Sequence, residues 1–118
     1  MNNKVKLGKA GEKIVAKKLA NTGFTILHKN YTQRYGEIDI IASKDDLLVF
    51  VEVKMRKNPI FDLEYLITRQ KQKKIIKVAS QYIARYNHTE KTCRFDVALI
   101  KGTETNYALT YIPNAFCE

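Results

Sequence analysis

The chain has 118 residues, a length that fits a single domain over residues 1–118 and excludes a two-domain enzyme. Apolar residues make up 45% of it, which excludes intrinsic disorder and a fold that depends on disulfide bonds, because a chain of this size buries roughly two-thirds of its unfolded surface. Lysine and arginine number 21 against 12 aspartates and glutamates, and the net charge of +9 favours nucleic acid as partner over an anionic membrane or a merely solvated basic surface.

The first predicted element is an amphipathic helix over residues 7–19. Its apolar residues recur at helical spacing, and a second stripe carries a lysine at every fourth position, at Lys9, Lys13 and Lys17. The sequence Asn21-Thr22-Gly23 then predicts the end of the helix. Residues 24–27 have the composition of a short strand.

Two more strands are predicted over residues 37–42 and 47–54, and the short connection Lys44-Asp45-Asp46 makes them a hairpin. Asn58-Pro59 interrupts regular structure, and apolar residues at helical spacing from Ile75 to Tyr86 then predict a second helix. The last two strands are predicted over residues 94–100 and 107–112. The order α-β-β-β-α-β-β indicates an α/β fold with a central mixed β-sheet flanked by helices on both faces.

Charged residues at the end of the most apolar strand form the candidate site. Glu52 and Lys54 are two residues apart and therefore share one face of the strand, and the hairpin can bring Asp39 alongside Glu52. Two carboxylates at the rim of a sheet repel each other unless a cation lies between them, and their oxygens suit a hard ion such as Mg²⁺ or Mn²⁺. Lys54 could then position or deprotonate a water molecule. The competing interpretation is an ordinary Glu–Lys ion pair, because the pattern E-x-K alone is not specific.

Several segments in a fixed order carry a resemblance to a known family. The two main ones are Gly36-Glu37-Ile38-Asp39-Ile40-Ile41-Ala42 and Val49-Phe50-Val51-Glu52-Val53-Lys54-Met55-Arg56. The similarity extends from Gly8-Lys9-Ala10-Gly11-Glu12 through Lys71-Gln72 to Arg94-Phe95-Asp96-Val97, and so covers nearly the whole chain. In this order the segments resemble the YraN family, which belongs to the PD-(D/E)XK nuclease-like superfamily with its restriction endonucleases and Holliday-junction resolvases.

The resemblance implies a restriction-endonuclease-like fold and a metal-dependent site. Asp39 and Glu52 would be catalytic carboxylates that bind Mg²⁺ or Mn²⁺, and the main-chain carbonyl of Val53 would be a further ligand. Lys54 would be the catalytic lysine, and Glu12 would be the acid that the first helix adds to the metal site.

The chain departs from the family pattern at two places. Thr32 stands where members of the family usually carry an arginine, and residues 59–64 replace a segment that contains glycine and proline. These departures concern a backbone-contacting group and the loop before the second helix. The set of carboxylates and lysine is intact.

The helices offer further candidate residues. Glu12 borders the apolar stripe, because apolar residues follow it at i+3, i+4 and i+7, so its carboxylate is expected to face inward; the alternative is an acid stabilised by the helix dipole. Lys71 and Gln72 lie roughly 50° from the centre of the apolar face of the second helix, at 100° per residue. They can therefore face the site, or they occupy a solvated first turn.

Basic and aromatic residues could contact nucleic acid. Phosphate contacts are expected from Arg56, Lys71, Gln72, Lys73, Lys74 and Lys77. Tyr31, Tyr35 and Tyr65 could stack on unpaired bases or pack in the core. Arg94 and Asp96, two apart on one strand, are expected to form a pair that supports the site.

Three functions compete on this basis. The leading hypothesis is a metal-dependent nuclease that acts on structured or damaged DNA, and the alternative is a non-catalytic nucleic-acid-binding module with the same fold. The third is a homodimeric interaction protein, and a homodimer would also suit a two-fold junction substrate, although no residue requires it. The two cysteines, Cys93 and Cys117, indicate neither a zinc site nor a disulfide framework. The absence of an apolar leader or spanning segment predicts a cytoplasmic protein that does not enter a membrane.

Overall fold

The computed structural model describes residues 3–57 and 67–117. The predicted segment Asn58-Pro59, the loop over residues 59–64 and Tyr65 lie outside these ranges. The chain forms, in order, α1 (Asn3–Asn21), β1 (Thr25–Gln33), β2 (Gly36–Lys44), β3 (Leu47–Arg56), α3 (Arg69–Arg85), β4 (Thr92–Thr103) and β5 (Asn106–Phe116).

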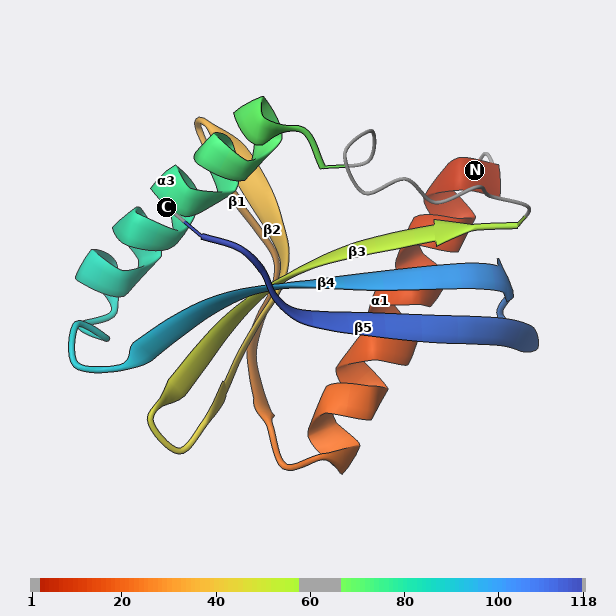
Figure 1. The fold of residues 1–118 in the computed structure, drawn as a ribbon, viewed down its shortest axis with the longest axis horizontal. Helices are drawn as coiled ribbons and strands as arrows, with labels where there is room; N and C mark the ends of the chain where they lie inside the picture. The colour runs from red at the N-terminus through yellow and green to blue at the C-terminus, as the bar shows by residue number, and fades with distance from the viewer. Residues whose placement is uncertain (1–2, 58–66, 118) are drawn as a thin grey trace.

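The five strands form one mixed sheet in the order β1-β2-β3-β4-β5. Strands β3 and β4 are parallel, and every other neighbouring pair is antiparallel. The sheet is strongly twisted, and α1 and α3 lie on its two sides (Figure 1). The described residues therefore confirm the predicted order of elements, and the arrangement fits a restriction-endonuclease-like fold.

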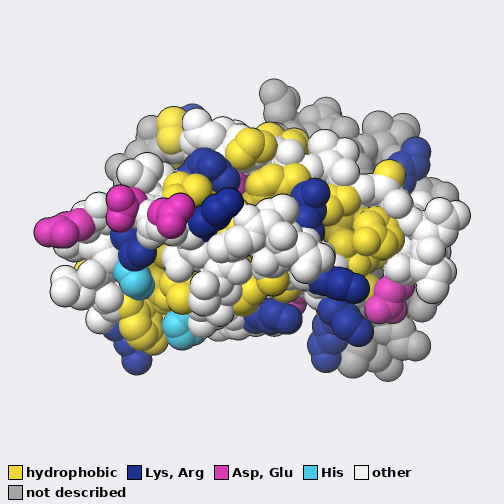
Figure 2. All heavy atoms as spheres, turned by 90° about the horizontal axis from the view of Figure 1, so that it is seen from below, with side chains coloured by type: hydrophobic (Ala, Val, Ile, Leu, Met, Phe, Trp, Pro, Cys, Tyr) yellow, Lys and Arg dark blue, Asp and Glu magenta, His cyan; other side chains and the backbone are white. Residues whose placement is uncertain are grey.

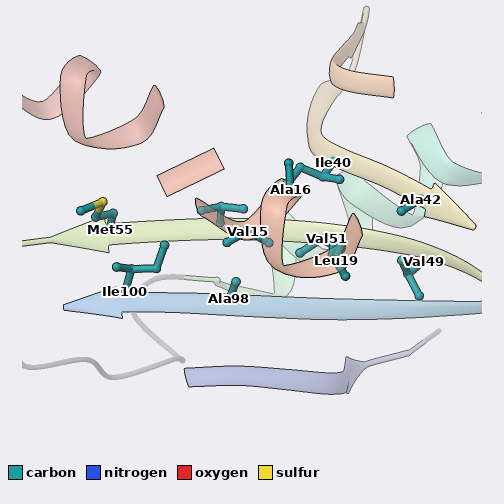
Figure 3. Packing of buried hydrophobic residues seen from close by; sticks show 11 residues of the cluster. Val15, Ala16, Leu19, Ile40, Ala42, Val49, Val51, Met55, Ala98 and Ile100 are labelled. Carbon is teal, nitrogen blue, oxygen red and sulfur yellow. The ribbon is translucent and has the colours of Figure 1, made fainter. Parts of the chain in front are cut away.

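Strand β3 is buried on both faces because its alternate residues point to opposite sides of the sheet. Val49 and Val51 contact one core cluster with Val15 and Leu19 of α1, as the labelled side chains in Figure 3 show. The second core cluster brings residues of α3 onto the other face, where Ile75, Val78 and Tyr82 pack with Leu48 and Phe50. A strand between two cores has to be apolar on both sides, which explains the continuous apolar run of its sequence.

The elements are longer than the sequence pattern predicts, and β1 shows why. The prediction ended this strand at residue 27 because polar residues follow, but the strand continues to Gln33. The strand β1 lies at the edge of the sheet, and its polar second half pairs with β2. In this half Tyr31 lies opposite Ile38 and Thr32 lies opposite Glu37. Backbone pairing with a neighbouring strand therefore extends the strand where hydrophobic patterning does not.

The second helix also begins earlier than its apolar pattern indicates. Thr68 is its N-cap, and the Thr68 hydroxyl accepts a hydrogen bond from the main-chain nitrogen of Lys71. The helix then runs from Arg69 to Arg85, so the basic residues of its first turns are helical.

The structure also bears on the expectations about membrane-spanning segments and cysteines. Within residues 3–57 and 67–117, no helix has both the length and the apolarity needed to cross a membrane. Cys93 and Cys117 are both exposed and free.

Candidate functional site

The site lies where β2 and β3 separate. Their pairing runs from Lys44 and Leu47 to Ile40 and Val51 and does not continue to Asp39. Ile38 packs in the core under α3, whereas Ile40 packs in the core under α1. Residues two apart on a regular strand share one face, so the alternation of β2 is broken at Asp39.

The carboxylate of Asp39 occupies the place of the missing backbone partner. Its Oδ2 accepts a hydrogen bond from the main-chain nitrogen of Val53 at 2.8 Å. The N–H and C=O of one strand residue point to the same neighbouring strand. The carbonyl of Val53 therefore faces the gap between β2 and β3 as well.

Glu52 is the most deeply buried acid of the site, with 5% of its surface exposed. Burial, followed by hydrogen bonding with Asp39 and the charge of Asp39, raises the pKa of Glu52 to about 9, although the lysines 54 and 71 oppose this shift. Its Oε2 atom is buried and has no hydrogen-bond partner among the described residues. The nearest cation is the ammonium group of Lys71, whose Nζ lies 3.8 Å from Oε2.

Lys54 lies on the same face of β3 as Glu52. Burial, together with the nearby ammonium group of Lys71, lowers the pKa of Lys54 to about 8, and the carboxylates of Glu52 and Asp39 act in the opposite direction. The structure thus places one lysine with an unusually weakly held proton beside one glutamate with an unusually tightly held proton.

Glu12 reaches the same region from α1. Burial raises the pKa of its carboxyl group, and the negative charges of Asp39 and Glu37 contribute, whereas a hydrogen bond with Asn30 and the charge of Lys29 lower it. The helix can bring Glu12 here because Gly11 allows it to approach β3 closely. A Cβ atom at Gly11 would lie 3.1 Å from both the Met55 Cβ and a Val53 methyl carbon.

These side chains line a single cavity of about 340 Å³, which we call the carboxylate cavity. Its lining includes Glu12, Glu37, Asp39, Glu52, Val53, Lys54, Arg56 and Lys71. Residues that are far apart in the sequence, on α1, β2, β3 and α3, therefore meet at one place, as the sequence analysis expected for Glu12, Asp39, Glu52 and Lys54.

The donors in the carboxylate cavity fit a small divalent cation. Glu52 offers a buried oxygen that has no hydrogen-bond partner within residues 3–57 and 67–117, and Asp39 and the Val53 carbonyl face the same gap. In the part of the chain that the structure describes, no group of three or more acidic, histidine or cysteine side chains forms a complete metal-ligand set. Mg²⁺ commonly takes only one or two carboxylates and completes its coordination with water and substrate phosphates, so two carboxylates suffice.

The candidate nucleic-acid residues separate into different places. Arg56 and Lys71 line the carboxylate cavity. Gln72 does not, because its side-chain amide donates to the carbonyl of Ile67 at 3.2 Å and lies beside Arg69 and Cys117. Lys73, Lys74 and Lys77 of α3 are exposed, and Lys74 lines a neighbouring cavity together with Lys71. On the face shown in Figure 2, Lys and Arg side chains form several separate groups between hydrophobic and uncharged side chains.

Arg94 and Asp96 form the expected pair, but in another part of the molecule. The Arg94 guanidinium donates two hydrogen bonds to Asp96, at 2.8 and 2.9 Å. Asp96 also accepts hydrogen bonds from the Tyr111 hydroxyl and from the main-chain nitrogen of Asn114. The pair therefore ties β4 to β5 and does not line the carboxylate cavity.

Two residues near the site were not singled out by sequence reasoning. Glu37 lines the carboxylate cavity, and its position two residues before Asp39 was an available signal. Gly11 sets the distance between α1 and β3. Its signal was a glycine on the apolar side of a helix, where glycine otherwise lowers helix stability.

Comparison with known proteins agrees with the similarity seen in the sequence. The model of the uncharacterised protein family UPF0102 matches residues 11–100. A UPF0102 protein of Dictyoglomus turgidum is 42% identical to this chain, over 98% of this chain and 100% of the relative. A UPF0102 protein of Clostridioides difficile is 44% identical, also over 98% of this chain and 100% of the relative. The resemblance to the YraN family is thereby confirmed, and the chain belongs to the uncharacterised protein family UPF0102.

Proposed function

We propose that the protein is a nuclease that depends on Mg²⁺ or Mn²⁺ and hydrolyses phosphodiester bonds in structured or damaged DNA. One observation carries this proposal. The buried Oε2 of Glu52 has no hydrogen-bond partner among the residues that the structure describes, and Glu52 lines a cavity together with Asp39 and Lys54. A buried acid oxygen without a partner is costly, and a bound cation would remove that cost.

Several residues of the carboxylate cavity have roles in this reaction. Asp39, Glu52 and the Val53 carbonyl would hold the ion, and Glu12 adds negative charge on the α1 side. The ion would lower the pKa of a bound water and neutralise charge on the phosphate in the transition state. The hydrogen bond from Val53 to Asp39 keeps one carboxylate oxygen fixed in place.

Lys54 is suited to proton transfer. At its pKa of about 8, roughly a tenth of Lys54 is neutral at pH 7, and the neutral amine can accept a proton from the attacking water. Lys71 lies beside Glu52, and its ammonium group can contact a non-bridging phosphate oxygen of the substrate.

A cleavage assay tests the proposal. Purified protein is incubated with flaps, junctions, single strands and RNA in Mg²⁺ or Mn²⁺, and we expect cleavage of at least one structured DNA. Lys54→Ala should abolish cleavage but leave the binding of Mn²⁺ largely in place, whereas Asp39→Ala should lose both. Glu104→Ala, in the exposed turn between β4 and β5, is the control and should behave as the wild type. Cleavage that survives Lys54→Ala would show that the role given to Lys54 is wrong.

A non-catalytic nucleic-acid-binding module is the second candidate. The observation in its favour is the ammonium group of Lys71, 3.8 Å from Glu52, which supplies positive charge to the site without a metal ion. This candidate predicts salt-dependent DNA binding with no cleavage of any substrate in the panel. That result with the wild-type protein would replace the nuclease proposal.

A further inference from the structure

A second cavity, of about 330 Å³, adjoins the carboxylate cavity, and we call it the Tyr35 cavity. Glu37 and Lys71 line both cavities, so the two are neighbours. The remaining lining residues that matter here are Tyr35, Gln70, Lys74 and Ile75. Its volume lies within the range of roughly 300–1,000 Å³ that is typical of small-ligand pockets.

Tyr35 presents an exposed aromatic ring at this cavity. With 43% of its surface exposed, it is one of three large hydrophobic residues in the described ranges that remain on the surface. Tyr31, by contrast, is buried in the core under α3. Tyr31 is therefore part of the core, whereas the ring of Tyr35 is available for contact with a ligand.

The position of the Tyr35 ring is fixed by α3. The ammonium group of Lys77 lies 3.7 Å from the ring centroid, which is a close cation–π contact. The next residue, Gly36, packs directly on the helix, since a Cβ there would lie 3.6 Å from the Lys74 Cβ and 3.7 Å from a Val78 methyl carbon. A ring held in this way loses little further freedom when a ligand stacks on it.

The charges around the ring favour a ligand with an anionic group. Lys71 and Lys74 line the cavity, and Lys77 lies on the ring. Among the described residues that line it, Glu37 is the one acidic residue, and it lies on the side shared with the carboxylate cavity. A phosphate would therefore bind on the α3 side, and Glu37 could accept a hydrogen bond from an amino group of a base.

We propose that the Tyr35 cavity binds one unpaired nucleotide of DNA, with its base stacked on Tyr35 and its phosphate bound by Lys71 and Lys74. This inference rests on the proposed function in nucleic-acid binding and specifies its substrate. Stacking on an aromatic ring does not depend on the identity of the base, because every base has a π face. Because Lys71 belongs to both cavities, the unpaired nucleotide lies next to the phosphodiester group at the carboxylate cavity. The protein therefore recognises the boundary between duplex and single strand.

Binding measurements without metal ions test this proposal separately from catalysis. Fluorescence anisotropy in EDTA compares a blunt duplex with the same duplex carrying a single-stranded tail at its 5′ or 3′ end. Tyr35→Ala and Tyr35→Leu remove the aromatic ring, and Tyr35→Phe retains it. Tyr107→Ala is the matched control, because Tyr107 is 45% exposed but lies on β5 beside lysines of α1. Thermal melting checks that every variant is folded.

We expect the wild type to prefer one of the tailed duplexes. Tyr35→Ala and Tyr35→Leu should weaken binding to it about tenfold or more, with the blunt duplex changed by less than about twofold. Tyr35→Phe and Tyr107→Ala should bind as the wild type does. A 2-aminopurine base in the tail should lose its fluorescence on binding to the wild type and keep it with Tyr35→Leu.

Three results would overturn the nucleotide site: equal loss of both duplexes in Tyr35→Ala, the same loss in Tyr107→Ala, or no preference of the wild type for a tail. If Tyr35→Ala selectively weakens binding of the tailed duplex and the wild type shows no metal-dependent cleavage, the nucleotide site is supported and the nuclease proposal is contradicted. If the wild type cleaves DNA but binds tailed and blunt duplexes equally, the nuclease proposal is supported and the nucleotide site is contradicted.

Discussion

The carboxylate of Asp39 accepts a hydrogen bond from the main-chain nitrogen of Val53 at 2.8 Å, across the gap where β2 leaves β3. A side chain here completes the backbone hydrogen bonding of a neighbouring strand. Asp39 therefore has a structural task in addition to the proposed binding of a metal ion, and substitutions can separate the two.

Asp39→Asn should keep the structural task and lose the metal ion. The amide oxygen of asparagine can still accept from Val53, so the melting temperature without metal should stay close to that of the wild type. Asp39→Ala leaves the Val53 nitrogen without its partner and should cost about 1–3 kcal/mol of unfolding free energy. Added Mn²⁺ should raise the melting temperature of the wild type but of neither variant. Stabilisation of Asp39→Asn by Mn²⁺ would contradict the proposed ligand.

Glu52→Gln should change how stability depends on pH. In the folded protein Glu52 keeps its proton up to its pKa of about 9, whereas in the unfolded chain it loses the proton near the ordinary value of 4.5. Between these values the folded state binds more protons, so the contribution of Glu52 to stability is complete below about pH 4.5 and is lost as the pH rises towards 9. Glutamine is neutral throughout and lacks this loss.

Thermal melting in EDTA at about pH 5 and about pH 8 measures this difference. Between about pH 5 and about pH 8, the melting temperature of Glu52→Gln should rise by several degrees relative to that of the wild type. About 1 kcal/mol corresponds to roughly 4–8 °C in a small domain. Lys54 acts in the opposite sense, because its pKa is lowered to about 8 and its contribution to stability recovers only above that value. Parallel pH profiles of variant and wild type would show that Glu52 titrates normally.

Two alanine substitutions in α1 should have opposite effects. A Cβ at Gly8 meets no atom within 4 Å, so Gly8→Ala should stabilise the helix by about 0.5–1 kcal/mol. At Gly11 a Cβ would lie 3.1 Å from Met55 and Val53, so Gly11→Ala should push the helix away from β3 and cancel or reverse that gain. Urea unfolding of the two variants measures the difference, and an equal gain at both positions would contradict the close packing of α1 on β3.

Lys73 and Lys77 of α3 should contribute positive charge to DNA affinity, and Lys77 also contacts the Tyr35 ring. Lys73→Glu combined with Lys77→Glu should lower affinity for unrelated duplex sequences to a similar extent and reduce the salt dependence of binding. Arg85→Glu combined with Lys91→Glu changes the net charge equally at the other end of α3 and is the control. Equal losses in the two double variants would indicate that net charge matters and that no particular surface does.

The hydrophobic pattern predicted the fold well because burial decides it. The apolar run of β3 and the helical spacing after Ile75 both correspond to cores that the structure contains. The same alternation rule correctly placed Glu52 and Lys54 on one face. It could not predict the break at Asp39, because the break follows from the separation of two strands rather than from the pattern of one.

Two alternatives that the sequence leaves open depend on contacts that only the structure shows. Lys71 and Gln72 were equivalent by their angle on the helix, yet only Lys71 reaches Glu52, because the amide of Gln72 is bound to the Ile67 carbonyl. Likewise, nothing in the sequence distinguishes Tyr31 from Tyr35. Tyr31 lies on β1 opposite Ile38 and packs in the core under α3, whereas Tyr35 lies in the turn between β1 and β2, where its ring stays exposed.

The parallel pairing of β3 with β4 has a consequence for the synthesis of the protein. Once the ribosome has made residues up to Arg56, the chain contains Glu12, Glu37, Asp39 and Glu52 of the carboxylate cavity, but one edge of β3 still has no partner. That edge is apolar, and it stays open until β4 has been made at residues 92–103. An unpaired apolar edge is where foreign strands attach. The nascent chain is therefore most prone to aggregation during this interval, and a truncation between β3 and β4 would make that state permanent.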